Sequence, residues 1–299
     1  MSDGHPFGQL VLAHGAPVVP GELWSAWTFN PALVLVAAAG AAYWRGLALS
    51  GDRARALGRA TSFFAGLAVV AIALGSPLDA LSGVLFSAHM VQHLLLTLAA
   101  PLLLVLARPG PVLRRALPAS ARRQVARSAP ARWARAWPGP RRVIVAWLAA
   151  VVTLWAWHVP VLYDAALDNA AVHALEHATL FATALAFWWT VGGAGRRAVP
   201  AYGAASLFMA SLAGGVLGAL LALSGRPWYA ERPGVAQWGL TAIEDQQLAG
   251  AIMWMPGGLV YLVAAFVLMV TWLTRAGGPG ASSSLTARHR GHASVGSRS

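Results

Sequence analysis

The segment from residue 82 to residue 107 reads SGVLFSAHMVQHLLLTLAAPLLLVLA and contains no Asp, Glu, Lys or Arg. A helix of about 20 predominantly apolar residues crosses the hydrocarbon core of a bilayer, so this segment is long enough to span one. Six further segments meet the same criterion. The sequence therefore predicts an all-α bundle of seven membrane-spanning helices near 30–49, 58–76, 82–107, 143–159, 170–192, 202–223 and 246–273.

The composition of the 299-residue chain supports this prediction. Hydrophobic residues make up 58% of the chain and charged residues 11%, whereas a soluble domain carries about 25% charged residues. That difference excludes an ordinary soluble enzyme, and it equally excludes an acidic disordered chain. The sequence has no cysteine, which excludes disulfides, thiolate metal sites and iron–sulfur clusters.

The arginines are distributed unevenly among the predicted loops. All 22 basic residues are arginine. Apart from Arg226 and Arg232, they lie near the end of the first predicted span or after the first, third, fifth or seventh. Because cytoplasmic loops of membrane proteins are enriched in basic residues, the N-terminus is predicted to lie outside and the C-terminus in the cytoplasm. The net charge of +12 then marks the cytoplasmic side and does not indicate a nucleic-acid partner.

This topology divides the chain into three parts. Residues 1–29 form an outer N-terminal segment, 30–273 the membrane domain, and 274–299 a disordered basic cytoplasmic tail. The basic loop 108–142 within the membrane domain is expected to lie on anionic lipid of the cytoplasmic leaflet. Gly214 and Gly218, four residues apart, predict close packing of the sixth helix against a neighbour.

Five histidines are predicted to lie at one depth near the outer side of the membrane. His89 and His93 share one helix face because they are four residues apart, and His173 and His177 do the same on another helix. His158 ends the fourth predicted span. Because ionisable groups within a membrane domain usually serve a function, these five side chains are the candidate site.

The donor types at this depth favour a transition metal. An imidazole-rich site without thiolates suits copper, zinc or iron, and thioether sulfur favours Cu(I). Asp245 is a further candidate, as a direct ligand or as a hydrogen-bond partner of a ligating histidine. Glu176, Met253 and Met255 are weaker candidates for the same metal.

The pentapeptide His173-Ala-Leu-Glu176-His177 also matches the H-x-x-E-H arrangement of inverted zinc proteases. A pattern of five residues arises readily by chance. We therefore expect no peptidase or other enzymatic activity.

Several sequence blocks together resemble the CtaG family of caa3-type cytochrome c oxidase assembly factors. They lie in order between roughly residues 24 and 273. The blocks are Ser76-Pro77-Leu78-Asp79, His89-Met90-Val91-Gln92-His93, Pro101-Leu102-Leu103, Trp157-His158-Val159-Pro160 with Tyr163-Asp164, His173-Ala174-Leu175-Glu176-His177, Asp245-Gln246-Gln247-Leu248-Ala249-Gly250 and Met253-Trp254. The resemblance implies a multi-pass protein of the bacterial plasma membrane that acts with oxidase subunits during maturation of a haem–copper oxidase.

Four functions follow from these observations as hypotheses. The first is an oxidase assembly factor that binds copper on its outer side and delivers it to the oxidase. A second is a membrane protein that binds haem b through two histidines, since facing imidazoles suit bis-His ligation. The third is a metal-ion permease, and the fourth is a metal-free assembly scaffold whose polar residues only lock the bundle.

Overall fold

The computed structural model describes residues 17–50, 53–128, 139–193 and 200–276, and every regular element in these ranges is a helix. The all-α prediction is therefore confirmed for this part of the chain. Residues 1–16 of the predicted outer segment and residues 277–299 of the predicted tail lie outside the described residues.

Six helical stretches are long and apolar enough to cross a membrane: Leu57–Gly75, Phe86–Ala107, Gly139–Trp157, Ala170–Gly192, Ala201–Ala222 and Ala242–Thr274. The first predicted span corresponds to α1 (Ala32–Ala48), an apolar helix of 17 residues. At about 1.5 Å per residue, a helix of this length falls short of a bilayer core of about 30 Å. The structure thus supports a multi-pass membrane protein, and the seventh crossing stays a prediction.

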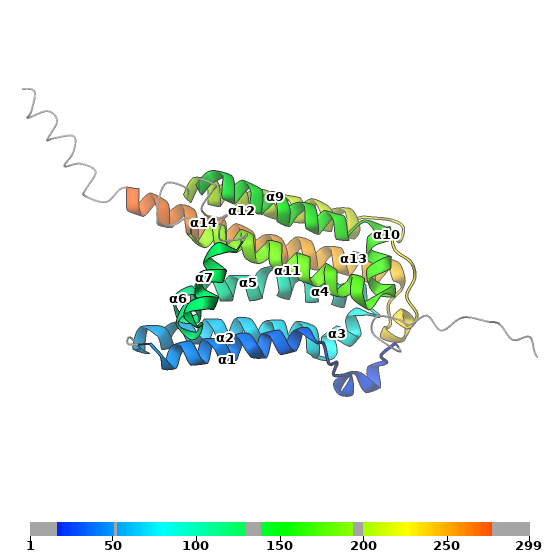
Figure 1. The fold of residues 1–299 in the computed structure, drawn as a ribbon. Helices are drawn as coiled ribbons and strands as arrows, with labels where there is room; N and C mark the ends of the chain where they lie inside the picture. The colour runs from blue at the N-terminus through cyan, green and yellow to red at the C-terminus, as the bar shows by residue number, and fades with distance from the viewer. Residues whose placement is uncertain (1–16, 51–52, 129–138, 194–199, 277–299) are drawn as a thin grey trace, which may run out of the picture.

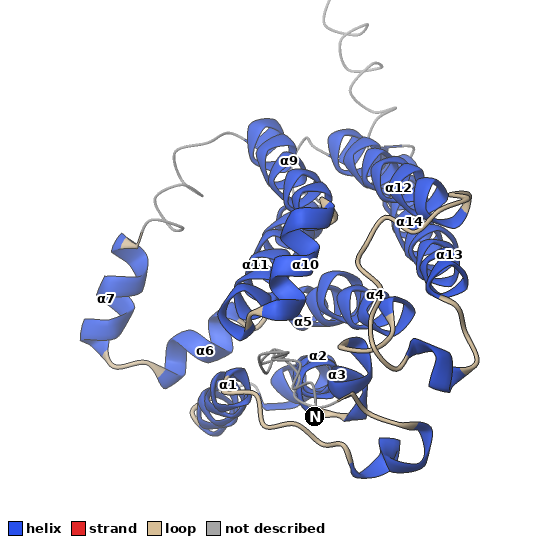
Figure 2. Ribbon diagram, turned by 90° about the vertical axis from the view of Figure 1, so that its right-hand side faces the viewer, coloured by secondary structure: helices blue, strands red, loops and turns tan. Residues whose placement is uncertain are grey.

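The long helices pack side by side as a bundle (Figures 1 and 2). α12 packs against α14 and α13, α9 against α11, and α2 against α5, while α1 packs against α2 and α6. The main elements are α2 (Arg53–Gly75), α3 (Pro77–Ser82), α4 (Phe86–Leu94), α5 (Ala100–Ala107), α6 (Gly110–Ala116), α7 (Ala119–Arg127), α9 (Gly139–Trp157), α10 (Pro160–Asp168), α11 (Ala170–Gly193), α12 (Pro200–Ala222), α13 (Ala242–Ile252) and α14 (Gly258–Ala276).

The two ends of the bundle differ in charge. One end, which we call the histidine end, carries α3, α10 and the connection between α12 and α13, and the opposite, arginine end carries α6 and α7 (Figure 1). Part of the predicted basic loop is therefore helical, and five arginines lie on α6 and α7. The positive-inside rule predicts that the arginine end faces the cytoplasm and the histidine end faces outward.

Two prolines interrupt the long helices and produce π turns. Pro101 has no N–H for the carbonyl of Thr97, and the preceding residues Leu95–Ala99 form a π-helix. The indole of Trp188 donates to that carbonyl at 3.0 Å. A second π-helix, over Met253–Gly257, contains Pro256. Each interruption is therefore accommodated within a continuous membrane helix.

Glycines bring α12 and α13 into close contact. A Cβ atom on Gly218 would lie 2.8 Å from the carbonyl oxygen of Gly250, and one on Gly250 would lie 2.4 Å from the amide nitrogen of Ala222. Neither position can accept a side chain without moving the backbone. The predicted close packing at Gly218 is confirmed, whereas Gly214 leaves 3.9 Å to Leu154.

Candidate metal-binding site

The two histidine pairs lie on α4 and α11, and a polar side chain fixes the start of each helix. Asn169 Oδ1 accepts hydrogen bonds from the N–H groups of Ala171 (2.9 Å) and Val172 (3.2 Å), which caps α11. At the start of α4, the Asp245 carboxylate accepts from the N–H groups of Phe86 (2.6 Å) and Ser87 (3.0 Å). Both helices therefore begin at defined residues, and the rotation that directs their histidines inward is set there.

The centre of the site consists of His89, His93, Glu176 and His177. Each offers one ligand atom, these atoms all lie within 4.8 Å of one another, and all four residues are buried. The Oε1 atom of Glu176 is 3.6 Å from Nε2 of His89 and 3.5 Å from Nε2 of His93. Imidazole and carboxylate groups from two helices thus converge on one point.

His173 and His158 extend the same group of rings. The centroid of the His173 ring lies 4.1 Å from that of His177 and 5.5 Å from that of His89. The His158 centroid lies 6.3 Å from that of His93. We call the five histidines together with Glu176 the histidine cluster. The five histidines that the sequence placed at one depth are brought together in space.

Several polar atoms of the histidine cluster lack a hydrogen-bond partner among the described residues. Glu176 and His89 are 0% exposed. Neither carboxylate oxygen of Glu176, and neither ring nitrogen of His89 or His93, has a hydrogen-bond partner among the described residues. Burying such groups without partners is costly, so native proteins rarely do it. A bound cation would satisfy the carboxylate and the imidazole nitrogens at once, and the donor set fits copper or zinc.

His158 is oriented by groups outside the histidine cluster. Its Nδ1 lies 2.7 Å from the carbonyl oxygen of Leu154, and its Nε2 lies 3.4 Å from the sulfur of Met90. The hydroxyl of Tyr229 donates to the His158 carbonyl at 3.1 Å. A thioether therefore lies beside one imidazole of the site, an arrangement compatible with Cu(I).

The remaining candidates lie elsewhere. Both carboxylate oxygens of Asp245 accept hydrogen bonds from the start of α4, the helix that carries His89 and His93. Asp245 therefore positions this helix, and its carboxylate oxygens do not bond to either imidazole ring. Met253 is buried in the apolar cluster of Phe86 and Leu217, and Met255 is 64% exposed on the outer surface of the bundle. The thioether beside the histidines is that of Met90, whose position next to His89 in the sequence was the available signal.

Aromatic side chains cover one face of the histidine cluster. The ring of Tyr163 lies 5.3 Å from that of His89, 4.9 Å from that of Phe86 and 4.5 Å from that of Tyr229. Burial raises the pKa of both tyrosines, so their hydroxyls are neutral hydrogen-bonding groups. Beyond them, the guanidinium of Arg232 contacts the Asp168 carboxylate at 3.1 Å. The same guanidinium lies 3.6 Å from the Asp164 carboxylate, so its charge is compensated by two acids of α10.

Asp79 lies near the opposite face. Its carboxylate accepts hydrogen bonds from Gln92 Nε2 (2.8 Å) and from the Thr28 hydroxyl (2.8 Å). Burial raises the pKa of Asp79, and the two hydrogen bonds lower it in part. Gln92 lies between His89 and His93 on α4, so Asp79 fixes the far side of the helix that carries them.

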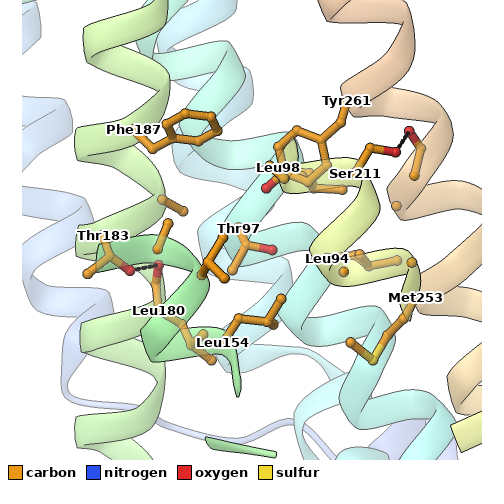
Figure 3. Close-up of a pocket in the computed structure, with 18 residues that line it drawn as sticks. Leu94, Thr97, Leu98, Leu154, Leu180, Thr183, Phe187, Ser211, Met253 and Tyr261 are labelled. Atoms are coloured by element: carbon orange, nitrogen blue, oxygen red, sulfur yellow. Dashed lines mark hydrogen bonds between the residues drawn. The ribbon is translucent and has the colours of Figure 1, made fainter. Parts of the chain in front are cut away.

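The bundle contains an apolar pocket on the arginine-end side of the histidine cluster (Figure 3). Leu94, Leu98, Phe187 and Tyr261 line it together with glycines of α12. Three hydroxyls of its lining are already bonded to backbone carbonyls: Thr97 donates to His93, Thr183 to Leu180 and Ser211 to Gly258. The lining of this pocket includes the Met253 thioether but no imidazole or carboxylate.

Comparison with known proteins agrees with the sequence blocks described above. No curated protein and no solved structure matches the chain. Residues 41–275 match the Caa3_CtaG family, described as cytochrome c oxidase caa3 assembly factor. This range covers α2 to α14 and the whole histidine cluster. The chain therefore belongs to the Caa3_CtaG family of cytochrome c oxidase assembly factors.

Proposed function

We propose that the protein holds a copper ion in the histidine cluster, on the outer side of a bacterial plasma membrane, and passes it to an oxidase subunit. The observation that carries this proposal is the convergence of five buried imidazoles and the Glu176 carboxylate. Because the chain belongs to a family of cytochrome c oxidase assembly factors, we take an oxidase subunit as the recipient of the copper. Such a transfer requires no catalytic step from the protein itself.

The number of donors suits delivery. A copper ion binds three or four such groups at a time. The histidine cluster has four ligand atoms within 4.8 Å of one another, and the imidazoles of His173 and His158 and the thioether of Met90 lie beside them. Surplus donors allow the ion to shift between ligand sets, which is the requirement for transfer by ligand exchange. The carboxylate of Glu176 offsets part of the ionic charge within the low-dielectric interior.

Two alternatives receive less support from the geometry. The rings of His89, His93, His173 and His177 lie with neighbouring centroids 4.1 to 5.9 Å apart, which favours a compact ion over a porphyrin placed between facing imidazoles. The pocket on the arginine-end side of the histidine cluster is apolar, which favours retention of an ion over its conduction across the membrane.

The test is copper titration of the protein purified without a histidine tag. We expect one Cu(I) to bind with high affinity to the wild type and to be lost when His93→Ala and His177→Ala are combined. A matched control combines His289→Ala and His292→Ala, which removes the same number of imidazoles from the C-terminal tail. Unchanged stoichiometry in the first variant would refute the site.

Two further measurements separate the alternatives. Normal copper content and activity of the oxidase in cells that carry the His93→Ala, His177→Ala variant would favour a metal-free scaffold. A Soret band in protein purified from its native host would favour haem.

A further inference from the structure

We infer that copper reaches and leaves the histidine cluster through a cavity between α1, α2 and α11, which we call the vestibule, with His173 and His177 as the first imidazoles on the route. This inference rests on the proposed function and adds to it the route by which copper enters and leaves the site. The vestibule has a volume of about 690 Å³. Its wall begins at Thr28 and Phe29, before the first turn of α1, and continues along α11.

Two imidazoles of the histidine cluster and one buried carboxylate are among the polar groups of the vestibule. His173 and His177 line it, and so does Asp79, whereas His89, His93, His158 and Glu176 do not. The two exposed positions Ala174 and Ala178 on α11 complete the wall beside the histidines. An ion entering here meets a carboxylate and two imidazoles before it reaches the deeper ligands on α4.

The other faces of the histidine cluster are closed. The aromatic face has Tyr163, Phe86 and Tyr229 in mutual ring contact, and only a small cavity of about 30 Å³ remains beside them. Arg232 lines that cavity and is held there by ion pairs with Asp164 and Asp168. The pocket toward the arginine end has a volume of about 60 Å³ and a mostly apolar lining, to which Met253 contributes a thioether.

The position of α1 explains why the vestibule exists. α1 packs against α2 along its length and against α6 at the arginine end. At the histidine end, the first turn of α1 and the start of α11 leave the space that forms the vestibule. Figure 2, which looks along the helices, shows α1 at the edge of the bundle and α11 nearer its centre. An acceptor protein that exchanges ligands with the histidine cluster therefore has to insert its own donors here.

The first experiment narrows the vestibule without changing a ligand. Ala174→Trp places an indole within it, and Leu175→Trp is the matched control because Leu175 is an exposed residue of the same helix that does not line the vestibule. Cu(I) is supplied from a chromophoric chelator, and both the rate and the final stoichiometry are recorded. We expect Ala174→Trp to load and release Cu(I) about tenfold more slowly at unchanged stoichiometry, since access and not affinity is altered.

The second experiment measures access directly and does not depend on metal. Because the chain has no cysteine, Ala174→Cys introduces a single thiol. We expect this thiol, in metal-free protein, to react with a membrane-impermeant maleimide added from the outer side of oriented vesicles. Prior loading of the histidine cluster is not required.

The outcomes distinguish this inference from the proposed function. Wild-type loading rates in Ala174→Trp, together with an unreactive Ala174→Cys, would overturn the vestibule route and leave the histidine cluster as the copper site. A wild-type chain that binds no Cu(I) would instead remove the proposed function. Slow loading in Leu175→Trp as well would show a general effect of bulk on α11 and would also overturn the route.

Discussion

The Asp245 carboxylate accepts a hydrogen bond from the backbone N–H of Phe86 at 2.6 Å, across 159 positions of sequence. The same carboxylate also accepts from the N–H and the hydroxyl of Ser87. Negative charge is stabilising at a helix N-terminus, where backbone N–H groups lack intrahelical acceptors. α13 thereby fixes the start of α4, and with it the inward direction of His89 and His93.

We predict that Asp245→Asn destabilises the protein by about 1–3 kcal/mol, the range for a buried hydrogen-bonding group left unsatisfied. The amide has one acceptor oxygen in place of two, and its NH₂ group would face N–H donors. Thermal unfolding in detergent measures the change. The neighbouring Glu244→Gln is the control, since Glu244 is exposed and only caps α13, and its effect should be smaller. Equal unfolding temperatures for the two variants would contradict this role for Asp245.

Glu176→Gln should change metal affinity and stability in opposite directions. The substitution keeps the shape of the side chain but removes the negative charge beside His89 and His93. We expect Cu(I) affinity, measured by competition with a chelator, to fall about 10–100-fold. Because a buried carboxylate without hydrogen bonds is itself unfavourable, the metal-free variant should be at least as stable as the wild type. A loss of stability at unchanged affinity would assign Glu176 a purely structural role.

Gly250→Ala should destabilise the contact between α12 and α13. The added Cβ would lie 2.4 Å from the amide nitrogen of Ala222, which is backbone and cannot rotate away. Overpacking of this kind costs about 1–3 kcal/mol. Gly58→Ala is the control, because nothing lies within 4 Å of a Cβ at that helical position, and it should be neutral or stabilising. Unfolding temperatures of both variants test the prediction, and similar values would contradict it.

Hydropathy and arginine placement were sufficient to predict the helical bundle, because the length of an apolar segment and its flanking charge are local properties. The spacing of His89 with His93 and of His173 with His177 also predicted a shared site, since residues four apart on a helix have one common face. The last long helix begins at Ala242 and not at residue 246, because Thr241 and Glu244 form a capping box before the apolar run.

The contacts of individual side chains were not available from the sequence. Asp245 lies in the first turn of a helix, and from the sequence it could equally have been a metal ligand. In the structure its carboxylate instead accepts hydrogen bonds from backbone N–H groups of α4. Met253 and Met90 have the same chemistry, and only the three-dimensional arrangement of the helices places the sulfur of Met90 beside His158. Such distinctions depend on helix rotation, which periodicity alone does not determine.

Asp79 should make stability depend on pH. Burial raises its pKa in the folded protein, whereas an unfolded chain releases this proton at about pH 3.9. The contribution of Asp79 to stability is therefore complete below that pH and is lost as the pH rises through the folded-state pKa. We predict that, as the pH rises above about 4, the unfolding free energy of the wild type falls relative to that of Asp79→Asn. A difference that stays constant from pH 3.5 to pH 7 would contradict this prediction.

Met90→Leu should lower the affinity for Cu(I) more than that for Zn(II). The Met90 sulfur lies 3.4 Å from Nε2 of His158, and thioether ligands favour Cu(I) over Zn(II). Leucine has a similar volume, so the fold should lose less than about 1.5 kcal/mol. Met253→Leu is the matched control, because Met253 is buried in the same apolar cluster as Met90. Competition titrations with each metal give the ratio of affinities. If the two variants shift this ratio equally, the Met90 thioether has no part in metal selection, and the imidazoles with Glu176 account for it alone.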